Sequence, residues 1–298
     1  MLSLICLSTS ASIASSRRAV ALAAPTALFS SAALPRLTSA EASEVDSFEE
    51  LRSRIDDPVL KSPSFVPKSS ASAQPLYPKW LAGRWLCTQT LTSFTTPLGV
   101  QFIGAPGRPI SEAEASAAQT RAQLNMPVTL ELRWLASGEG AIEDRAFNAR
   151  SRFDAFAGRA VVKESSACDD NPQAIACTYL DFKGPVQQKL LVNALRVAAP
   201  PVVTEASSQQ PVVVASELTR GIFARKLVPG DTRSFPPITT DSETIVQLGW
   251  APAGGGDELL GRLRLASYLQ PLDPLFFEAR GRSVSLSNYN LKLKRLSE

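Results

Sequence analysis

The sequence predicts a mainly β protein, an antiparallel up-and-down barrel of about 8–10 strands with one or two short helices. From residue 77 onward, short stretches of alternating apolar and polar residues recur at a spacing of about ten residues. The turns between them are rich in glycine and proline, and only one internal stretch has strong helix-forming character. We favour a barrel because closing a meander removes its exposed strand edges.

The first 42 residues have the composition of a targeting signal. No acidic residue precedes Glu41, and the pair Arg17-Arg18 stands directly before an apolar run that is too short to span a membrane. Ala40-Glu41-Ala42 is a small-residue cleavage site. We therefore expect residues 1–42 to be a plastid transit segment plus a twin-arginine signal for the thylakoid lumen, with no transmembrane segment in the mature protein. A bacterial twin-arginine signal or a mitochondrial presequence is the alternative.

Residues 43–75 are expected to form a short helix followed by a linker, and residues 76–298 the barrel domain. Apolar residues at helical spacing in the stretch 44–57 are Val45, Phe48, Leu51 and Ile55. Pro58 ends this pattern, and the residues after it are rich in proline and serine without periodicity.

The barrel domain is predicted to open with a turn and a strand. Trp80 lies in a short helical turn, which Gly83 can end with a positive φ. From Trp85 the chain alternates, which places on one face Trp85, Cys87, Gln89 and Leu91. Glycine, any residue, tryptophan and then a strand resembles the first strand of lipocalin-like barrels, although any strand can start at a core tryptophan. The resemblance implies that Trp85 closes the base and that Arg295 stacks across it, so Trp80, Gly83, Trp85 and Arg295 would be structural.

The rest of the chain is expected to contain one helix and many strands. The helix spans 111–124, opens with a capping box of Ser111 and Glu114, and has little apolar surface. The strands are predicted over 100–103, 128–134, 141–153, 159–165, 175–182, 187–197, 212–223, 240–250, 258–270 and 282–296. In the last strand the apolar residues switch from even to odd positions, which predicts a β-bulge near Ser287-Asn288.

Composition excludes several classes of function. The formal net charge of +3 and the absence of a long basic run argue against nucleic-acid binding. The chain has no histidine, which removes Ser-His-Asp and Cys-His catalysis and His-ligated zinc. We therefore expect no catalytic residues and no metal site. The sequence leaves the identity of any cofactor unknown.

The cysteines allow two interpretations. Cys168 and Cys177 flank an Asp-Asp-Asn-Pro turn, so antiparallel strands would bring their sulfurs together, and in an oxidising lumen we predict a disulfide. The alternative is a pair of small buried side chains. Cys87 is expected to be buried on the first strand, and Cys6 belongs to the targeting signal.

Polar residues within predicted strands are the candidates for ligand binding. Arginines inside a barrel are costly unless a carboxylate or an anionic ligand pairs with them. One interpretation is a set of ion pairs, such as Glu217 with Arg262 or Arg264. The other is a pocket for a carboxylate, phosphate or propionate-like group, entered near Arg145, Arg220 and Arg262. The candidate ligand-binding residues are Arg145, Asn148, Glu217, Arg220, Arg262 and Tyr268.

Several sequence blocks occur in one order along the barrel domain. They are PKWLAGRW, PLG-x-x-F-x-G, EDRAFNA, SE-x-TR, RLASYLQPLDPLFFEARGR and a closing Y-x-L-x-L-x-R. Together they resemble an uncharacterised family of cyanobacterial and plastid proteins, domain of unknown function 6816, over roughly residues 76–296. The resemblance implies a plastid or lumen protein and no particular activity.

Two functions remain as expectations. The first is a non-enzymatic thylakoid-lumen protein that binds a small amphipathic or anionic ligand, of lipid or pigment type, inside a lipocalin-like barrel. The second is an assembly or maintenance factor for a photosynthetic membrane complex, acting through its surface with a filled barrel. An open barrel interior would favour the first and a filled interior the second.

Overall fold

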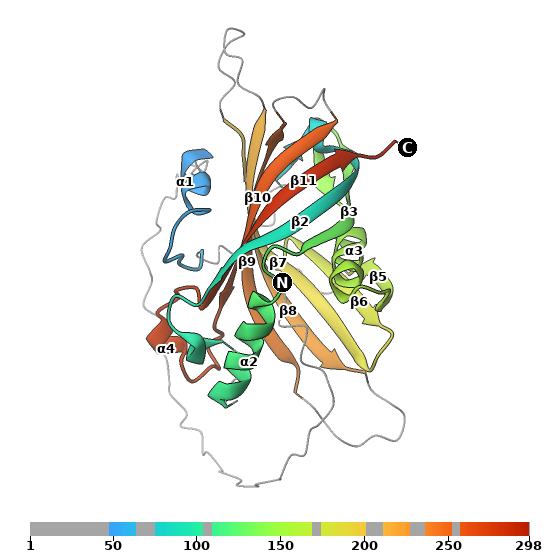
Figure 1. Cartoon of the computed structure of the whole chain (residues 1–298). Helices are drawn as coiled ribbons and strands as arrows, with labels where there is room; N and C mark the ends of the chain where they lie inside the picture. The colour runs from blue at the N-terminus through green and yellow to red at the C-terminus, as the bar shows by residue number, and fades with distance from the viewer. Residues whose placement is uncertain are drawn as a thin grey trace, which may run out of the picture. The chain divides into compact units, whose positions relative to one another are not determined.

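The computed structural model describes residues 48–63, 75–103, 109–168, 174–200, 211–226, 236–251 and 257–297. Within these residues the protein is mainly β, as predicted, and eleven antiparallel strands form one sheet (Figure 1). The targeting signal expected at residues 1–42, with its Arg17-Arg18 pair, lies outside the described residues, as does part of the predicted linker.

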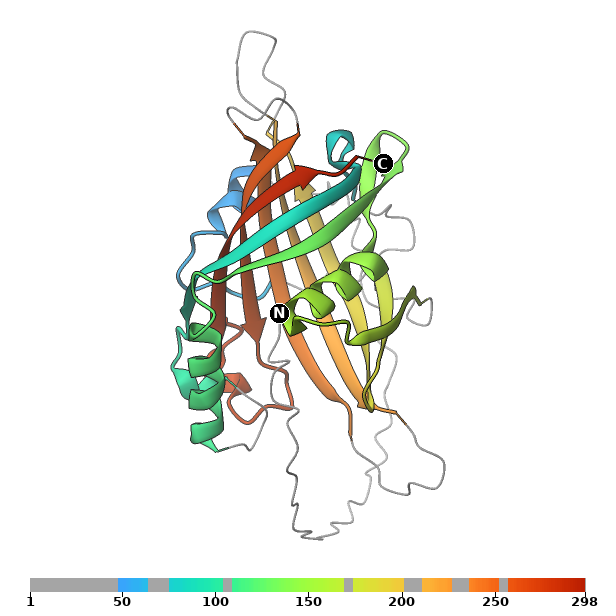
Figure 2. The ribbon, with the colours of Figure 1, turned by 45° about the vertical axis from the view of Figure 1, so that its right-hand side comes forward.

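The sheet curls into a half-barrel with two free ends (Figure 2). Its strand order is β1-β4-β3-β2-β11-β10-β9-β8-β7-β6-β5, so that β1 and β5 are the outermost members. The predicted fold class is confirmed, with the refinement that the sheet remains open. The strands are β1 (Tyr77–Pro78), β2 (Gly83–Thr95), β3 (Pro127–Ser137), β4 (Gly140–Glu143), β5 (Val162–Ala167), β6 (Ala176–Phe182), β7 (Val186–Ala198), β8 (Val212–Arg225), β9 (Ile238–Trp250), β10 (Glu258–Tyr268) and β11 (Ser285–Arg295).

The concave face of the sheet, called the inner face below, holds an extensive apolar core. Val213 and Ala215 of β8 pack there in one cluster with Trp85 of β2 and Leu132 of β3. Three strands separate β2 from β8 in the sheet, so these contacts depend on its curvature. The predicted alternation along β2 is confirmed, because its buried residues are Trp85, Cys87, Gln89 and Leu91.

The convex face, called the outer face below, is covered by residues 48–62, which we call the strap. Leu51, Ile55 and Leu60 of the strap are buried against the strands, in one cluster with Val214 and Ile245. The strap contains α1 (Phe48–Ser53), so the predicted helix is present but shorter. Residues 48–62 are therefore part of the folded domain and not a linker.

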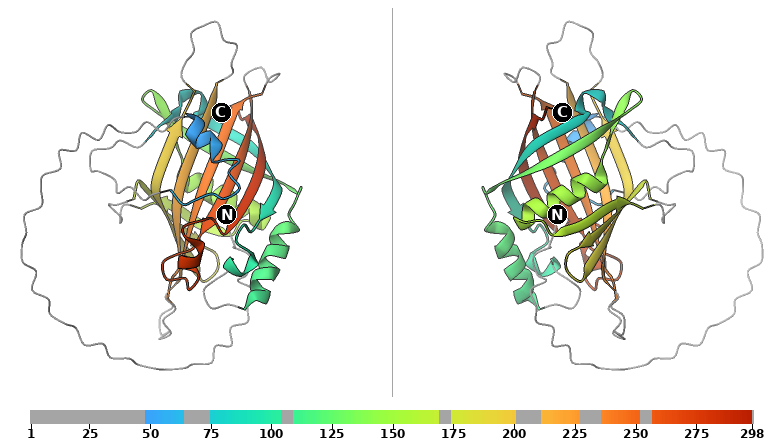
Figure 3. Two further views of the ribbon diagram at one scale, coloured as in Figure 1. Left: turned by 90° about the vertical axis from the view of Figure 1, so that its left-hand side faces the viewer. Right: turned by 90° about the vertical axis from the view of Figure 1, so that its right-hand side faces the viewer.

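A third helix completes the wall at the open side of the half-barrel. The strand predicted over 141–153 is only partly correct. Its first residues belong to the short strand β4 (Gly140–Glu143), and the following residues form α3 (Arg145–Ala157). Asp144 caps the helix by accepting a hydrogen bond from the Phe147 N–H at 3.1 Å, and Gly158 ends it with a φ of 64°. Helices α1 and α3 lie on opposite faces of the sheet (Figure 3).

Helix α3 also binds the free edge of β3. The Arg133 N–H donates to Asn148 Oδ1 at 2.7 Å, and the Glu131 N–H donates to the Ser151 hydroxyl at 3.0 Å. Farther along the helix, Asp154 Oδ1 accepts from the N–H of Val162 at 2.8 Å, at the start of β5. Because these side chains satisfy backbone groups that a neighbouring strand would otherwise pair, the helix takes the place of strand pairing at this seam.

The remaining helices agree only in part with the sequence prediction. The stretch predicted as a strand at 100–103 is a 3-10 helix, η2 (Val100–Phe102). The predicted helix is present as α2 (Ile110–Arg121), but its N-cap is Pro109 and no side-chain capping bond forms, so the expected capping box is wrong. The turn before β2 is the 3-10 helix η1 (Lys79–Leu81), as expected. A short helix, α4 (Phe276–Ala279), precedes β11.

A β-bulge lies beside Asn288, as predicted, but its extra residue belongs to β2 and not to the last strand. Asn288 of β11 pairs with Ser93 of β2, whereas Tyr289 pairs with Leu91, which leaves Thr92 as the extra residue. Its hydroxyl donates a hydrogen bond of 3.1 Å to the Asn288 carbonyl. The bulge therefore changes the alternation of β2 only. In β11 alternation continues, with Leu286 in the outer cluster and Tyr289 in the inner one, which explains the parity switch of its apolar residues.

Candidate functional site

A cluster of charged residues lies on the inner face at the N-terminal end of α3. Arg145 reaches from the helix to β8, where its Nη2 donates a hydrogen bond of 2.7 Å to Glu217 Oε2. The two side chains are 12% and 19% exposed, so the ion pair is largely removed from water. Glu217 also accepts a bond of 3.1 Å from the Thr219 hydroxyl. This pair ties the helix to a strand on the other wall of the half-barrel.

A second ion pair lies beside the first. Glu143, at the end of β4, accepts hydrogen bonds from Arg152 Nη1 at 3.0 Å and from Asn148 Nδ2 at 2.9 Å. Burial alone would raise the pKa of this carboxyl, but the charges of Arg152 and Arg145 and the bond from Asn148 bring the pKa below its ordinary value. Glu143 is therefore ionised at neutral pH.

Two aromatic residues form the wall next to these charges. Tyr77 and Trp134 meet edge to face with ring centroids 6.3 Å apart, and Trp134 is the strand partner of Glu143. Burial raises the pKa of the Tyr77 hydroxyl, and the nearby charge of Glu143 adds to that increase. Tyr77 therefore stays neutral at physiological pH.

Buried N–H donors on the inner face lack a hydrogen-bond partner among the described residues. They are Gln89 Nε2, Trp134 Nε1 and Arg145 Nε. Leaving such a donor unpaired costs about 1–3 kcal/mol, and most buried polar groups in proteins are paired. Trp134 and Arg145 belong to the cluster just described, so the cluster holds two buried donors that no described residue pairs.

The base of the half-barrel is arranged as the lipocalin-like resemblance implies. The Arg295 guanidinium lies over the Trp85 ring, 4.2 Å from its centroid. Arg295 also donates to the carbonyls of Ala82 at 2.8 Å and Trp80 at 2.7 Å. The Trp80 ring packs against Trp250, with centroids 5.5 Å apart. The base is thus closed by aromatic rings and one arginine.

Half of the predicted ligand-binding residues lie on the outer face. Arg220 binds Asp241 through two hydrogen bonds of 2.8 Å. Arg262 pairs with Asp56 of the strap at 2.9 Å. Tyr268 packs in the outer apolar cluster. The predicted pocket near Arg145, Arg220 and Arg262 is therefore not formed.

Strand parity explains this division. Successive side chains of a strand point to opposite faces. On β8 the odd-numbered residues, such as Glu217, face inward, and the even-numbered residues, such as Arg220, face outward. Arg145, Asn148 and Glu217 thus lie together on the inner side. The alternative pairing of Glu217 with Arg262 or Arg264 is also wrong, since Glu217 pairs with Arg145.

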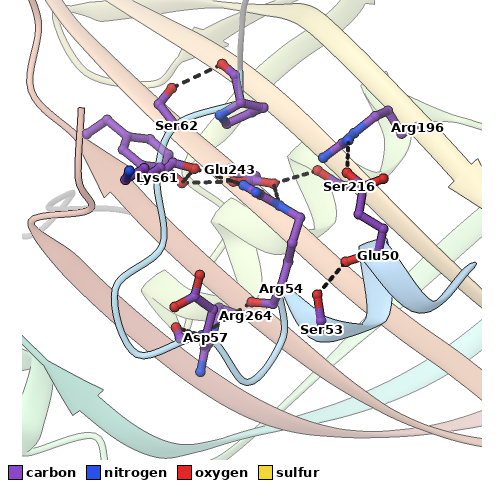
Figure 4. Close-up of polar contacts among 12 residues, drawn as sticks. Glu50, Ser53, Arg54, Asp57, Lys61, Ser62, Arg196, Ser216, Glu243 and Arg264 are labelled. Carbon is purple, nitrogen blue, oxygen red and sulfur yellow. Dashed lines mark hydrogen bonds and ion pairs between the residues drawn. The ribbon is translucent and has the colours of Figure 1, made fainter. Parts of the chain in front are cut away.

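The outer face contains a buried carboxylate that the sequence analysis missed. Glu243 of β9 is fully buried and binds Arg54 of the strap, with Nη2 to Oε2 at 2.6 Å (Figure 4). It also accepts from the Ser216 hydroxyl at 2.6 Å and from the Tyr268 hydroxyl at 2.8 Å. The role of Tyr268 is therefore to help neutralise a buried charge under the strap.

Sequence signals for two of the missed features do exist. Asp144 and Gly158 are a typical N-cap residue and a typical C-terminal glycine, and together they would have indicated α3 and placed Arg152 on it. No comparable local signal marks Glu243, because its partner Arg54 is 189 residues away in the chain.

The predicted disulfide between Cys168 and Cys177 is confirmed, with Cα atoms 5.0 Å apart. Cys87 is free and buried on β2, as expected. Burial raises the pKa of its thiol to about 12. Cys87 is therefore a structural thiol of low reactivity.

Within the described residues, no group of three or more histidine, cysteine, aspartate or glutamate side chains could hold a metal ion. In the same residues, no helix has both the length and the apolar character needed to cross a membrane.

Comparison with known proteins identifies a family but no activity. The family described as a domain of unknown function, DUF6816, matches residues 69–297. Searches of the curated proteins and of the solved structures find no match. The match covers most of the chain, including the inner-face cluster, the base and the disulfide, so this chain is a member of the DUF6816 family.

Proposed function

We propose that this protein is a non-enzymatic binding protein that holds a small amphipathic or anionic ligand on the inner face of its half-barrel. The observation that supports the proposal is the Arg145 cluster, where buried donors of Arg145 and Trp134 have no partner among the described residues. Beside them the inner face is apolar, and the partly exposed Val197 and Val246 flank Ala215 at the border of the core cluster. A carboxylate or phosphate head group would bind the donors, and an apolar tail, of lipid or pigment type, would contact the apolar wall.

The charge states in the cluster favour binding over proton transfer. The pKa of Glu143 is lowered and that of Tyr77 is raised, so each keeps its ordinary charge near neutral pH. A general acid or base works best with a pKa near the working pH. An arrangement of fixed charges therefore suits recognition of a ligand.

The test is native mass spectrometry, with an absorption spectrum, of protein purified from its own organelle. We expect a co-purifying small molecule, and we expect Arg145→Gln to weaken its binding at least tenfold, because a charge-assisted hydrogen bond contributes roughly 1.5–3 kcal/mol. Arg220→Gln is the matched control, since Arg220 is also paired with a carboxylate but lies on the outer face. A folded protein without any bound molecule, or equal occupancy in both variants, would contradict the proposal.

We place the protein in the chloroplast thylakoid lumen on the basis of residues 1–42. Arg17-Arg18 precedes an apolar run and an Ala40-Glu41-Ala42 site. Changing both arginines to lysine should block import into the lumen while plastid entry continues. If that precursor is still processed to a product that starts near Ser43, the twin-arginine assignment is wrong.

A second candidate function is an assembly or maintenance factor for a photosynthetic membrane complex. Two exposed apolar side chains favour this function. Phe277 of α4 is 82% exposed, and Leu272, which precedes the helix, is 93% exposed. Large apolar side chains exposed close together in sequence are typical of contact surfaces. If this function is correct, replacing both with serine should release the protein from a complex in native gels while leaving ligand occupancy unchanged.

A further inference from the structure

A pocket of about 240 Å³ lies on the outer face, where the turn after α1 meets β2, β10 and β11. The polar side chains that line it include Asp56, Ser93, Arg262, Arg264 and Asn288. Its volume is below the roughly 300–1,000 Å³ of sites for drug-sized molecules, so it suits a small group. It lies on the face opposite the Arg145 cluster and does not depend on the function proposed above.

Arg264 supplies this pocket with a buried positive charge. The residue is 7% exposed. Its Nε donates to Asn288 Oδ1 at 2.8 Å, and its Nη1 donates to the carbonyls of Arg54 and Asp57. All of these acceptors are neutral, and among the described residues Nη2 has no hydrogen-bond partner. The carboxylates of Asp56 and Asp57 lie near enough to act on its charge, but neither is bonded to it. A buried guanidinium without a directly bonded carboxylate is costly, which is a reason to expect an anion beside it.

A second arginine stands at the more exposed side of the pocket. Arg262 pairs with Asp56 of the strap through bonds of 2.9 and 3.2 Å, and the two side chains are 45% and 68% exposed. An exposed ion pair of this kind contributes little stability, about 0–1 kcal/mol. Arg262 can therefore leave Asp56 for a better acceptor at small cost.

The β-bulge adds a hydroxyl donor to the same place. Ser93 Oγ accepts a hydrogen bond of 2.7 Å from Asn288 Nδ2, so its own hydrogen remains available to donate. The extra residue Thr92 also lines the pocket. Bulges often redirect side chains at binding sites, and here the bulge places a hydroxyl beside two arginines.

We propose that this outer-face pocket binds a small oxyanion, a phosphate or phosphate-like group, with Arg264 as the buried anchor and Arg262 as the second ligand. Planar guanidinium groups bind phosphate oxygens through paired hydrogen bonds. Free phosphate and a lipid phosphate head group share this chemistry.

Binding in this pocket is coupled to the position of the strap. Arg264 already holds the strap through the Arg54 and Asp57 carbonyls, and Asp56 forms part of the pocket wall. An anion bound to Arg264 and Arg262 would therefore join the strap to β10. Occupancy should slow amide exchange in residues 51–60, because a ligand that binds only the closed form stabilises it.

The experiment measures phosphate binding by calorimetry at constant ionic strength, using the chain from residue 43 to 298. We expect saturable binding that Arg262→Gln weakens about tenfold, and that Asp56→Asn strengthens about two- to fivefold by freeing Arg262. Arg264→Gln should abolish binding, and the other two variants keep the test valid if that one fails to fold. Arg84→Gln is the matched control, because Arg84 forms a comparable exposed pair with Glu131.

A second arm identifies the source of the phosphate. Vesicles of phosphatidylglycerol in phosphatidylcholine, compared with phosphatidylcholine alone, replace free phosphate as the probe. Binding to anionic vesicles with the same dependence on Arg262 and Asp56 supports a lipid head group, and binding of phosphate alone supports a free anion. No saturable binding of either probe, or binding that Arg262→Gln and Asp56→Asn leave unchanged, overturns the proposal.

Discussion

At the scale of single residues, Arg295 shows how one side chain can close the base of the half-barrel. It stacks on the Trp85 ring and donates to two carbonyls of the turn before β2. Gly83 is required beside it, because its φ is 120° and a Cβ there would lie 2.9 Å from Arg295 Nη1. The arginine, the tryptophan and the glycine therefore depend on one another.

We expect Trp85→Ala to lower the free energy of unfolding by about 3–5 kcal/mol, as a core truncation. Arg295→Lys should cost about 1–3 kcal/mol, because lysine keeps the charge but cannot donate to both carbonyls from a planar group. Urea unfolding followed by tryptophan fluorescence measures both. Lys294→Ala, at an exposed neighbouring position, is the control, and an equal effect at 294 and 295 would contradict the structural role.

Glu143 predicts a pH dependence of stability. Its folded pKa lies below the ordinary value of 4.5, so the unfolded chain takes up the proton first as the pH falls. The stabilisation is therefore complete above about pH 5 and is lost as the pH falls from there toward the folded pKa. Urea unfolding between pH 7 and pH 3.5 should show a shallower decline for Glu143→Gln than for the wild type. Parallel declines in the two proteins would contradict the assignment, and Glu131→Gln, at a more exposed carboxylate, is the control.

At the scale of elements, α3 decides how the half-barrel ends. Backbone N–H groups at the free edge of β3 donate hydrogen bonds to the side chains of Asn148 and Ser151. The Asp154 carboxylate accepts from the backbone N–H at the start of β5. The same helix carries Arg145 and Arg152 to the inner face. The element that replaces strand pairing therefore also builds the charged cluster.

We expect Asn148→Ala to destabilise the protein by about 2–5 kcal/mol. Asn148 is fully buried, and its loss leaves the Arg133 N–H without a partner and removes one hydrogen bond each from the Arg133 carbonyl and Glu143. Amide exchange should increase along the β3 edge near Arg133. Arg150→Ala is the control, because Arg150 lies on the same helix with a half-exposed side chain. Equal stability of the two variants would show that α3 does not secure this edge.

At the scale of the whole molecule, the strap makes the N-terminal segment part of the domain. It buries Leu51, Ile55 and Leu60 against the outer face and supplies Arg54 to the buried Glu243. A buried carboxylate that loses its partner costs about 3–5 kcal/mol. The sheet alone would therefore expose an apolar face that contains an unpaired charge.

We expect the chain that starts at residue 76 to be less stable than the chain that starts at residue 43, and to bind an apolar fluorescent dye. Both effects arise from loss of the strap. Thermal unfolding monitored by circular dichroism compares the two chains. A chain that starts at residue 48 should match the longer one. Equal melting temperatures for chains that start at 43 and 76 would show that the strap contributes nothing.

The strands and the disulfide were accessible from the sequence because each depends on local order along the chain. The base was instead inferred from a resemblance, since Arg295 and Trp80 are 215 residues apart. Alternation places Trp85 and Leu91 on one face. The turn between Cys168 and Cys177 brings their strands together. These features need only neighbours within one strand or one hairpin.

The site depended on tertiary structure for a physical reason. Alternation predicts that Glu217 and Arg220 face opposite sides of the sheet. Only the curvature of the sheet decides which side is the inner face and which residues can pair with them there. The polar run that forms α3 has a typical N-cap and a C-terminal glycine but no apolar stripe, and hydrogen bonds to the free edge of β3 also favour the helix. Glu243 and Arg54 meet across 189 residues. The sequence therefore determined the strands and the disulfide hairpin of this protein, whereas long-range packing decided the contacts at the base and where the other charges meet.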